Sequence, residues 1–479
     1  MNSSSSVPVS KLRWWQPVLF GALAGGLGWG IRGQYGHETG AMIAGVLVGL
    51  TLLFLFRPDA PLLGSARAVA WFTVAIGLGG SMTYGQTIGL TQNAPLVGHW
   101  EAWRWGMLGL AIKGGIWIGF GGVFLGMGLS GVRYRVSEIA VLMIGLLLLF
   151  LAGKWLLNEP FDPAHRILPR IYFSEAWRWA PGAELKPRRE VWGGLLLGLL
   201  GLLAYLRAWR ADILAWRVAL WAVLGGVLGF PLGQCLQSYH AWNLESFRSG
   251  EWSNIDSVIN WWNMMETTFG AIMGATLGLG LWFNRARLPA EHLPQPVSIS
   301  PRLEWALVLG YVYLLILGEF GSPPAVIEPV LDLGLAMGVV PMLAIAGGKW
   351  WPFLAPLPIT LIPIAGKTIR QLCYKEPVSP PWAGWLVYGV CPLLLMLGAT
   401  WWAVQQLENE RGARTFFRWT LLLTVWVYFS LNFAFFRFPW VWVSWTYRTP
   451  NGIIYTLCAV GLSWAAWRLY RPRVGDAPA

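Results

Sequence analysis

Apolar segments long enough to cross a membrane recur along the whole chain, and they constrain its fold more than any other feature of the sequence. A helix needs about 20 predominantly apolar residues to span the hydrocarbon core of a bilayer. Of the 479 residues, 56% are hydrophobic and only 12% are charged, whereas a soluble chain carries roughly 25% charged residues. The sequence therefore predicts an all-α polytopic membrane protein.

About fourteen transmembrane helices are expected from the lengths of these segments. Their predicted bounds are 16–35, 39–56, 68–88, 104–130, 136–157, 190–208, 213–236, 257–284, 303–320, 326–347, 351–366, 382–404, 416–436 and 451–470. The first residues, MNSSSSVPVSKLRWWQ, show no cleavage pattern of a secretory signal. The first apolar segment is therefore expected to stay in the mature chain.

The distribution of Lys and Arg predicts the orientation. The short loops favour the N-terminal side as the cytoplasmic one, although loop 158–190 carries several arginines on the opposite side. We expect a multi-pass protein of the cytoplasmic (inner) membrane with both termini in the cytoplasm.

Tryptophan is unusually frequent, with 34 residues, and many stand at the ends of predicted spans. These include Trp14, Trp15, Trp71, Trp105, Trp192, Trp305 and Trp382. Indole rings favour the headgroup level of a bilayer, which explains this distribution as anchoring. The alternative is that some of the rings form platforms for a sugar or a cation.

The net charge of +12 is spread over many loops without a long basic run. This pattern indicates contact with anionic membrane lipid rather than with nucleic acid. The four cysteines, Cys235, Cys373, Cys391 and Cys458, have no metal-ligand spacing. The sequence predicts no metal and no cofactor.

Two stretches of the chain share a pattern of glycine and glutamine. Aligned without a gap, residues 25–34 match residues 225–234 at Gly25, Gly26, Gly33 and Gln34, which correspond to Gly225, Gly226, Gly233 and Gln234. Both glutamines are expected to face one aqueous space shared by the two halves.

The helix after each stretch also has a counterpart. Glu38 and Arg57 are separated by 19 residues, as are Glu266 and Arg285. At 1.5 Å per residue this is about 30 Å, one hydrocarbon thickness. Each helix is thus predicted to carry a carboxylate at its outer end and an arginine at its inner end.

Fainter matches follow in the same order: 67–71 with 302–305, 152–154 with 365–367, and Trp192 with Trp382. They predict a parallel 6+6 internal duplication, in which residues 16–208 form a first six-helix lobe and residues 209–404 a second. Residues 1–15 would be a cytoplasmic tail, and 405–479 would add two C-terminal helices and a tail. The competing explanation is chance, because small-residue patterns are common in membrane helices.

This arrangement of two six-helix halves resembles the major facilitator superfamily, a family of two-lobed secondary transporters. That family usually carries a glycine motif with basic and acidic residues between the second and third spans. The loop here reads RPDAPLLGSAR, in which Asp59 and Arg67 occur at a different spacing. The resemblance implies two lobes that rock about a central substrate site.

Ionisable and amide side chains cluster at the outer end of the first helix pair. Arg32, Gln34, His37 and Glu38 lie within seven positions. Arg32 and Gln34 are candidates for substrate binding, and His37, Glu38 and the matching Glu266 are candidates for proton coupling. The alternative is structural, because a carboxylate suits the first turn of a helix and Arg32 would be its ion-pair partner.

Lys113 is the charge placed most deeply within a predicted span. It either faces a cavity as a fixed positive charge or extends its ammonium group to the outer interface. Lys154 and Lys367 lie near span ends, where the second behaviour is favoured. Gln86 and Gln234 are either ligand donors or hydrogen bonds between helices.

These residues predict a secondary transporter for a small polar solute. Arg32 and Lys113 favour an anionic solute, and Glu38 or Glu266 is the candidate site for coupling to a proton. The alternative is a membrane-embedded glycosyl- or acyltransferase that acts on a lipid-linked or sugar substrate, with Asp162 and His165 of loop 158–190 as its most suggestive feature. Enzyme motifs are otherwise missing from the sequence, so no catalytic residue is assigned.

Overall fold

The computed structural model describes residues 12–36, 38–80, 82, 84–174, 176–182, 187–289, 296–321, 324–327, 338–407, 412–437 and 445–468. Within these residues the chain is helical and contains no strand. The segments are rich in Leu, Ala, Gly and Trp, and in a bilayer only a helix or a closed barrel satisfies every backbone polar group. The all-α fold class is therefore confirmed for the described residues.

The helices up to residue 283 are α1 (Trp15–Arg32), α2 (Glu38–Phe56), α3 (Leu62–Gly79), α4 (Gly85–Gln92), α5 (Trp100–Leu129), α6 (Val136–Asn158), α7 (Trp192–Ala204), α8 (Ile213–Trp242), α9 (Leu244–Phe247), α10 (Trp252–Asp256) and α11 (Trp261–Phe283). The later ones are α12 (Pro301–Phe320), α14 (Val340–Gly347), α15 (Trp351–Leu354), α16 (Thr360–Ile369), α17 (Pro381–Gly384), α18 (Cys391–Gln405), α19 (Gly412–Phe435) and α20 (Thr449–Arg468). Several of these are joined end to end by π-helical turns, for example Ala355–Ile359 between α15 and α16.

Nine helical segments of the described chain are long and apolar enough to cross a membrane. They are Glu38–Phe56, Leu62–Gly79, Trp100–Leu129, Val136–Asn158, Trp192–Trp209, Ile213–Trp242, Pro301–Gly318, Trp351–Lys375 and Pro381–Gln405. The expected total of fourteen spans stays a prediction, and residues 328–337 of the expected span 326–347 lie outside the described residues.

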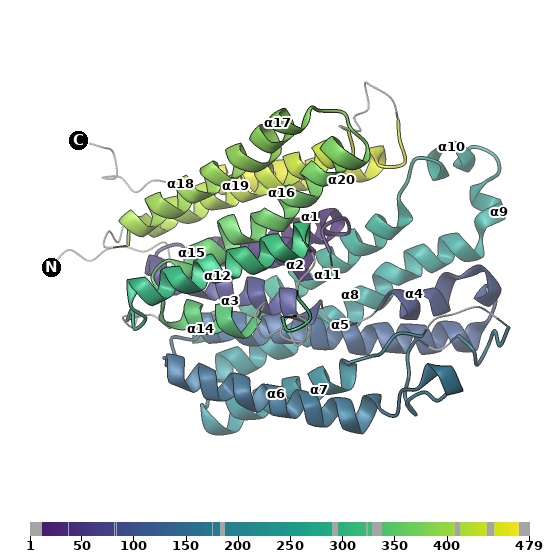
Figure 1. The fold of residues 1–479 in the computed structure, drawn as a ribbon, viewed down its shortest axis with the longest axis horizontal. Coiled ribbons are helices and arrows are strands. Elements are labelled where there is room, and N and C mark those ends of the chain that lie inside the picture. The colour runs from purple at the N-terminus through teal and green to yellow at the C-terminus, as the bar shows by residue number, and fades with distance from the viewer. Residues whose placement is uncertain are drawn as a thin grey trace.

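The centre of the bundle is formed by helices that approach each other through glycine. A β-carbon built on Gly25 of α1 would lie 2.0 Å from the carbonyl oxygen of Gly270 in α11. One built on Gly226 of α8 would lie 2.0 Å from the carbonyl oxygen of Gly114 in α5. Small residues at such crossings let membrane helices pack backbone against backbone. Figure 1 shows α5 and α8 side by side along most of their length.

The glycine contacts also fix the helix directions. Gly21 packs against Gly274 and Gly25 against Gly270, so α1 and α11 are antiparallel. Gly233 of α8 packs against Met265 and Gly225 of the same helix against Met273, so α8 and α11 are antiparallel as well. It follows that α1 and α8 run in the same direction. The predicted duplication of residues 16–208 and 209–404 requires this direction, but it stays a prediction.

The expected span 68–88 is two helices. Helix α3 ends at Gly79 with Gly80 as its C-cap, and α4 begins at Gly85. Two adjacent glycines weaken the helix because glycine loses the most backbone entropy there. Both pieces nevertheless pack on the same neighbour, since Gly128 and Gly121 of α5 contact α3 and Gly106 contacts α4. Together α3 and α4 form one interrupted helix antiparallel to α5.

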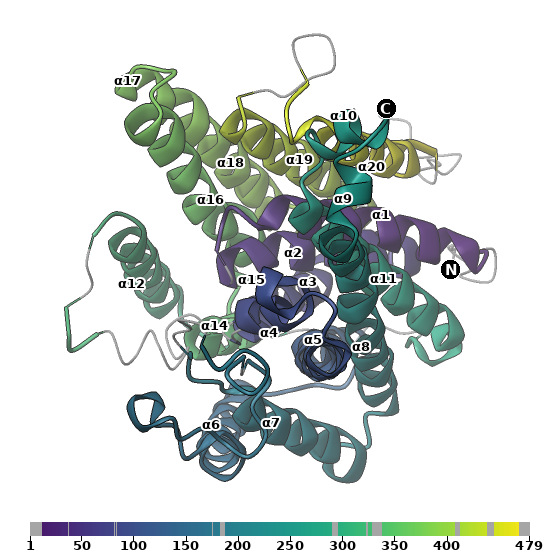
Figure 2. The ribbon, with the colours of Figure 1, turned by 90° about the vertical axis from the view of Figure 1, so that its right-hand side faces the viewer.

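The remaining helices flank this centre. Figure 2 looks along many of the helices and shows α6 and α7 beyond α5, with α16, α18, α19 and α20 on the opposite side. Helix α12 lies at the edge of the bundle in the same view, and its Tyr311 packs against Trp351 of α15 at 5.3 Å between ring centroids. Helices α9 and α10 follow α8 as a projection at one end of the molecule.

Candidate functional site

The interruption between α3 and α4 lies opposite the middle of α5. A β-carbon on Gly79 would be 2.1 Å from Cδ1 of Trp117, and Lys113 lies one helical turn from Trp117. Lys113 is the fourteenth of the thirty residues of α5, a helix about 45 Å long. The break between α3 and α4 therefore lies at a level far from either end of α5.

The first buried ion pair at this level joins α1 to α11. Nε of Arg32 lies 3.3 Å from Oε1 of Glu266, and each of the two residues is only 2% exposed. The Nη2 group of Arg32 donates a hydrogen bond to the hydroxyl of Tyr84, which belongs to the interruption. Its Nη1 group is buried and has no hydrogen-bond partner among the described residues.

Aromatic rings surround the Arg32 guanidinium. Its central carbon lies 5.0 Å from the ring centroid of Trp29, 5.4 Å from that of Tyr84 and 5.6 Å from that of Trp117. The electron-rich faces of such rings attract a cation and replace part of its hydration. Three rings and one carboxylate thus hold the positive charge inside the bundle.

Glu266 is oriented by its own helix. Its Oε1 accepts a hydrogen bond from the indole of Trp262 at 3.1 Å, and its Oε2 accepts one from Nδ2 of Asn263 at 3.3 Å. Asn263 also donates to the carbonyl of Gly30 in α1 at 3.0 Å, and Tyr455 of α20 donates to the same carbonyl at 2.8 Å. The carboxylate is therefore held by groups from α1 and α11.

The second buried ion pair joins α5 to the end of loop 158–190. Nζ of Lys113 lies 2.5 Å from Oε1 of Glu190 and 2.8 Å from the hydroxyl of Thr87 in α4. Glu190 also accepts hydrogen bonds from Ser174 at 2.8 Å and from the backbone N–H of Phe173 at 3.0 Å. Lys113 is 1% exposed and Glu190 is 2% exposed, so Lys113 does not extend to the interface.

The short stretch 84–87 connects the two pairs. Tyr84 contacts Arg32, and Thr87 contacts Lys113. Trp117 packs edge-on against Trp29 and lies one turn along α5 from Lys113. Two cations and two carboxylates are thus arranged around one helix interruption, with equal positive and negative charge. We call Arg32, Glu266, Lys113, Glu190 and Tyr84 the buried polar centre.

The other sequence-predicted residues lie elsewhere or at its edge. Gln34 is half-buried, and its Oε1 has no partner among the described residues. It lines a cavity of about 10 Å³ with Asn263, Arg448 and Tyr455, next to α19 and α20. Gln234 is fully buried and donates to Thr91 of α4 at 2.8 Å. The two glutamines therefore have different neighbours, and the expectation that they face one shared space stays a prediction.

Three further predictions concern Gln86, Glu38 and His37. Gln86 accepts a hydrogen bond from the backbone N–H of Arg188 at 3.1 Å and so binds α4 to loop 158–190. Glu38 is the first residue of α2, as the helix-capping interpretation expects, and it interacts electrostatically with Arg32. His37 lies outside the described residues.

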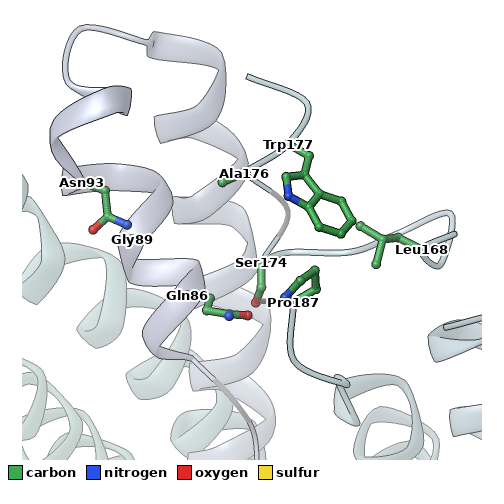
Figure 3. Close-up of a pocket in the computed structure, with 8 residues that line it drawn as sticks. All are labelled: Gln86, Gly89, Asn93, Leu168, Ser174, Ala176, Trp177 and Pro187. Atoms are coloured by element: carbon green, nitrogen blue, oxygen red, sulfur yellow. The ribbon is translucent and has the colours of Figure 1, made fainter. Parts of the chain in front are cut away.

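Loop 158–190 covers α4. Figure 3 shows Gln86 of the helix pointing toward Ser174 and Pro187 of the loop, and Asn93, the C-cap of α4, also lines the space between them. The space between them has a volume of about 30 Å³, enough for about two water molecules. The pair Asp162 and His165 is at the surface, with 2.6 Å between Oδ2 and Nδ1.

No protein-family model, curated protein or solved structure matches this chain significantly. Function is therefore inferred from the geometry of the buried polar centre.

Sequence reasoning missed Glu190 and Tyr84. A signal for Tyr84 exists, because the polar run SMTYGQT follows a Gly-Gly pair inside an otherwise apolar span. Glu190 has no such signal, since it ends a long irregular loop and its partner is 77 positions away. Within the described residues, no three His, Cys, Asp or Glu side chains are arranged to hold a metal ion.

Proposed function

We propose that the protein is a secondary transporter of the cytoplasmic membrane, which moves a small anionic solute together with a proton past the interruption between α3 and α4. The observation that carries the proposal is an interrupted helix that adjoins two buried ion pairs. Interrupted helices supply binding groups for solutes and coupling ions in many transporters. Ionisable residues inside a membrane are costly and commonly belong to such pathways.

The Arg32–Glu266 pair supplies a mechanism of coupling. When a proton binds Glu266, its carboxyl group becomes neutral and no longer balances the charge of Arg32. The anionic group of a solute can then bind the guanidinium, whose Nη1 group has no protein partner among the described residues. One proton and one negative charge enter together, so the net charge of the buried polar centre stays constant.

The described geometry corresponds to a closed state. Arg32, Glu266 and Lys113 are each at most 2% exposed, so a solute reaches them only after helices move apart. In the proposal the halves 16–208 and 209–404 rock against each other as in the facilitator superfamily. The contacts of α1 with α11 and of α5 with α8 would form the moving interface, and the N-terminus would lie in the cytoplasm.

The alternative, a membrane-embedded transferase, is less favoured by the same geometry. It would need room for a sugar or acyl donor beneath loop 158–190. The space of about 30 Å³ between this loop and α4 is far smaller than the 300–1,000 Å³ or so of ordinary ligand sites.

Proton movement in reconstituted vesicles tests the proposal. The purified protein is incorporated into liposomes that contain a pH-sensitive dye, and inorganic phosphate, sulfate, gluconate or glutamate is added outside. We expect at least one of these anions to acidify the lumen, and Glu266→Gln to abolish the acidification. The matched control is Glu101→Gln, which neutralises an exposed carboxylate in the first turn of α5.

Two results would contradict the proposal. One is that none of the four anions acidifies the lumen of vesicles with the wild-type protein. The other is that Glu266→Gln acidifies the lumen at the wild-type rate.

A further inference from the structure

A lateral groove separates the ends of α6 and α7, at a distance from the buried polar centre. The two helices are in close contact at one end, where a β-carbon on Gly153 would lie 2.4 Å from the carbonyl oxygen of Gly193. Toward the N-terminal end of α6, side chains of the two helices and of the turn after α7 line an open groove of about 850 Å³. This volume lies in the range of specific sites for small molecules, about 300–1,000 Å³.

The long wall of the groove is apolar. It is formed on α6 by Val141, Leu142, Gly145, Leu146 and Leu149. From Val141 to Leu149 the helix rises about 12 Å, close to the roughly 15 Å that one leaflet contributes to the hydrocarbon core. Gly145 leaves open space, because a β-carbon built there would have no atom within 4 Å. An acyl chain fits a groove of this length and character.

The mouth of the groove is basic. Arg133, Arg135 and Arg210 line it, together with one acidic residue, Glu138. Glu138 is already engaged, because it accepts a hydrogen bond from Tyr205 and lies 3.1 Å from Nε of Arg210. Arg210 also donates to the carbonyl of Arg133 at 2.7 Å. The exposed guanidinium groups of Arg133 and Arg135 remain available to an anion.

Two further features at the mouth suit a lipid headgroup. Trp209 is 82% exposed, and indole rings prefer the headgroup level of a bilayer. Tyr205–Trp209 form a π-helical turn, closed by the hydrogen bond from the Arg210 N–H to the carbonyl of Tyr205 at 3.0 Å. Such turns are rare and are frequent at functional sites.

We propose that this groove is a binding site for one anionic phospholipid. The phosphate contacts Arg133 and Arg135, and an acyl chain lies along α6 past Gly145. Three arginines and one glutamate leave the mouth with an excess of positive charge, which favours an anionic headgroup over a zwitterionic one. The mouth lies at the N-terminal end of α6, where α5 ends and α8 begins. Because α1 and α8 run in the same direction, the first residues of α1 lie on this side as well.

Native mass spectrometry of the detergent-purified full chain tests the site, with phosphatidylglycerol and phosphatidylcholine as competing probes. We expect wild-type protein to retain phosphatidylglycerol preferentially. The double variant Arg133→Gln/Arg135→Gln should bind it about 30-fold more weakly, since each basic residue near a headgroup contributes about fivefold. Gly145→Leu should weaken retention of both lipids by filling the groove.

Matched controls separate the site from general effects. Arg287→Gln/Arg302→Gln removes the same charge from exposed positions outside the groove, and Gly310→Leu fills open space on α12. Both should bind phosphatidylglycerol like the wild type. The proposal is overturned if Arg133→Gln/Arg135→Gln and Gly145→Leu retain it unchanged, or if phosphatidylcholine competes equally. It is also overturned if the protein is a dimer that Gly145→Leu converts to a monomer without changing lipid retention.

Discussion

Replacing Lys113 by Met should weaken the packing of loop 158–190 on α4 without unfolding the helix bundle. Glu190 would then keep its hydrogen bonds from Ser174 and from the backbone N–H of Phe173, but its charge would be buried without a cation. Removing one partner of a buried pair typically destabilises a protein by about 3–5 kcal/mol. Because Glu190 belongs to a loop, the easiest relief is local opening that returns the carboxylate to water.

Hydrogen exchange at the Phe173 amide measures this opening. A change of about 3–5 kcal/mol corresponds to exchange roughly 10² to 5 × 10³ times faster. The double variant Lys113→Met/Glu190→Gln should recover most of the protection, since it leaves no uncompensated buried charge. Lys154→Met serves as the control, because Lys154 is only partly buried on α6.

Two results would refute this reasoning. Exchange at Phe173 that is unchanged in Lys113→Met would mean that the ion pair does not hold the loop. A double variant that exchanges faster than the single one would mean that the lost contacts, rather than the uncompensated charge, dominate.

Three other substitutions test separate parts of the structure. Gly25→Val should destabilise the bundle by about 1–3 kcal/mol or more in thermal unfolding, because even its β-carbon would lie 2.0 Å from the carbonyl oxygen of Gly270, whereas Gly398→Val occupies open space and should be neutral. Gly79→Ala should displace Trp117, whose Cδ1 would be 2.1 Å from the new β-carbon. The rate of anion-driven proton uptake should therefore fall, while the melting temperature changes little. Asp59→Asn should lower the free energy of unfolding by less than about 1 kcal/mol, and by nothing in high salt, because its ion pair with Arg414 at 2.8 Å is partly exposed. A larger loss in chemical or thermal unfolding would contradict this assignment as a surface ion pair.

The sequence predicts the helices better than it predicts their partners. Apolar segments predicted α2, α6 and the helical segment Pro381–Gln405 to within a few residues, because backbone hydrogen bonding in an apolar medium leaves few alternatives to a helix. The interruption after Gly79 was missed, since glycine pairs are common in membrane helices and most do not break them. Only the polar residues that follow, ending in Tyr84, distinguish this pair.

Side-chain pairing was predicted only in part. Arg32, Glu266 and Lys113 were identified as candidates because charges within apolar segments are rare. That Arg32 pairs with Glu266 of a distant helix, and Lys113 with Glu190, depends on which helix faces are adjacent, and local pattern carries no such information. Gln34 and Gln234 illustrate the limit, because similar local sequences have different neighbours in the fold.

The accessibility of the interruption itself tests the central claim most directly. Met82 lies within it and is 1% exposed, so Met82→Cys, in a chain whose four native cysteines are replaced, reports on this position with a charged, membrane-impermeant thiol reagent. We expect the reagent to modify Met82→Cys from both sides of the vesicle membrane, and an anion that drives proton uptake to slow this modification. The control Met396→Cys, a similarly buried position in α18, should stay unmodified. Failure of the reagent to reach Met82→Cys from either side, in vesicles that are transporting, would contradict a solute pathway between α3 and α4.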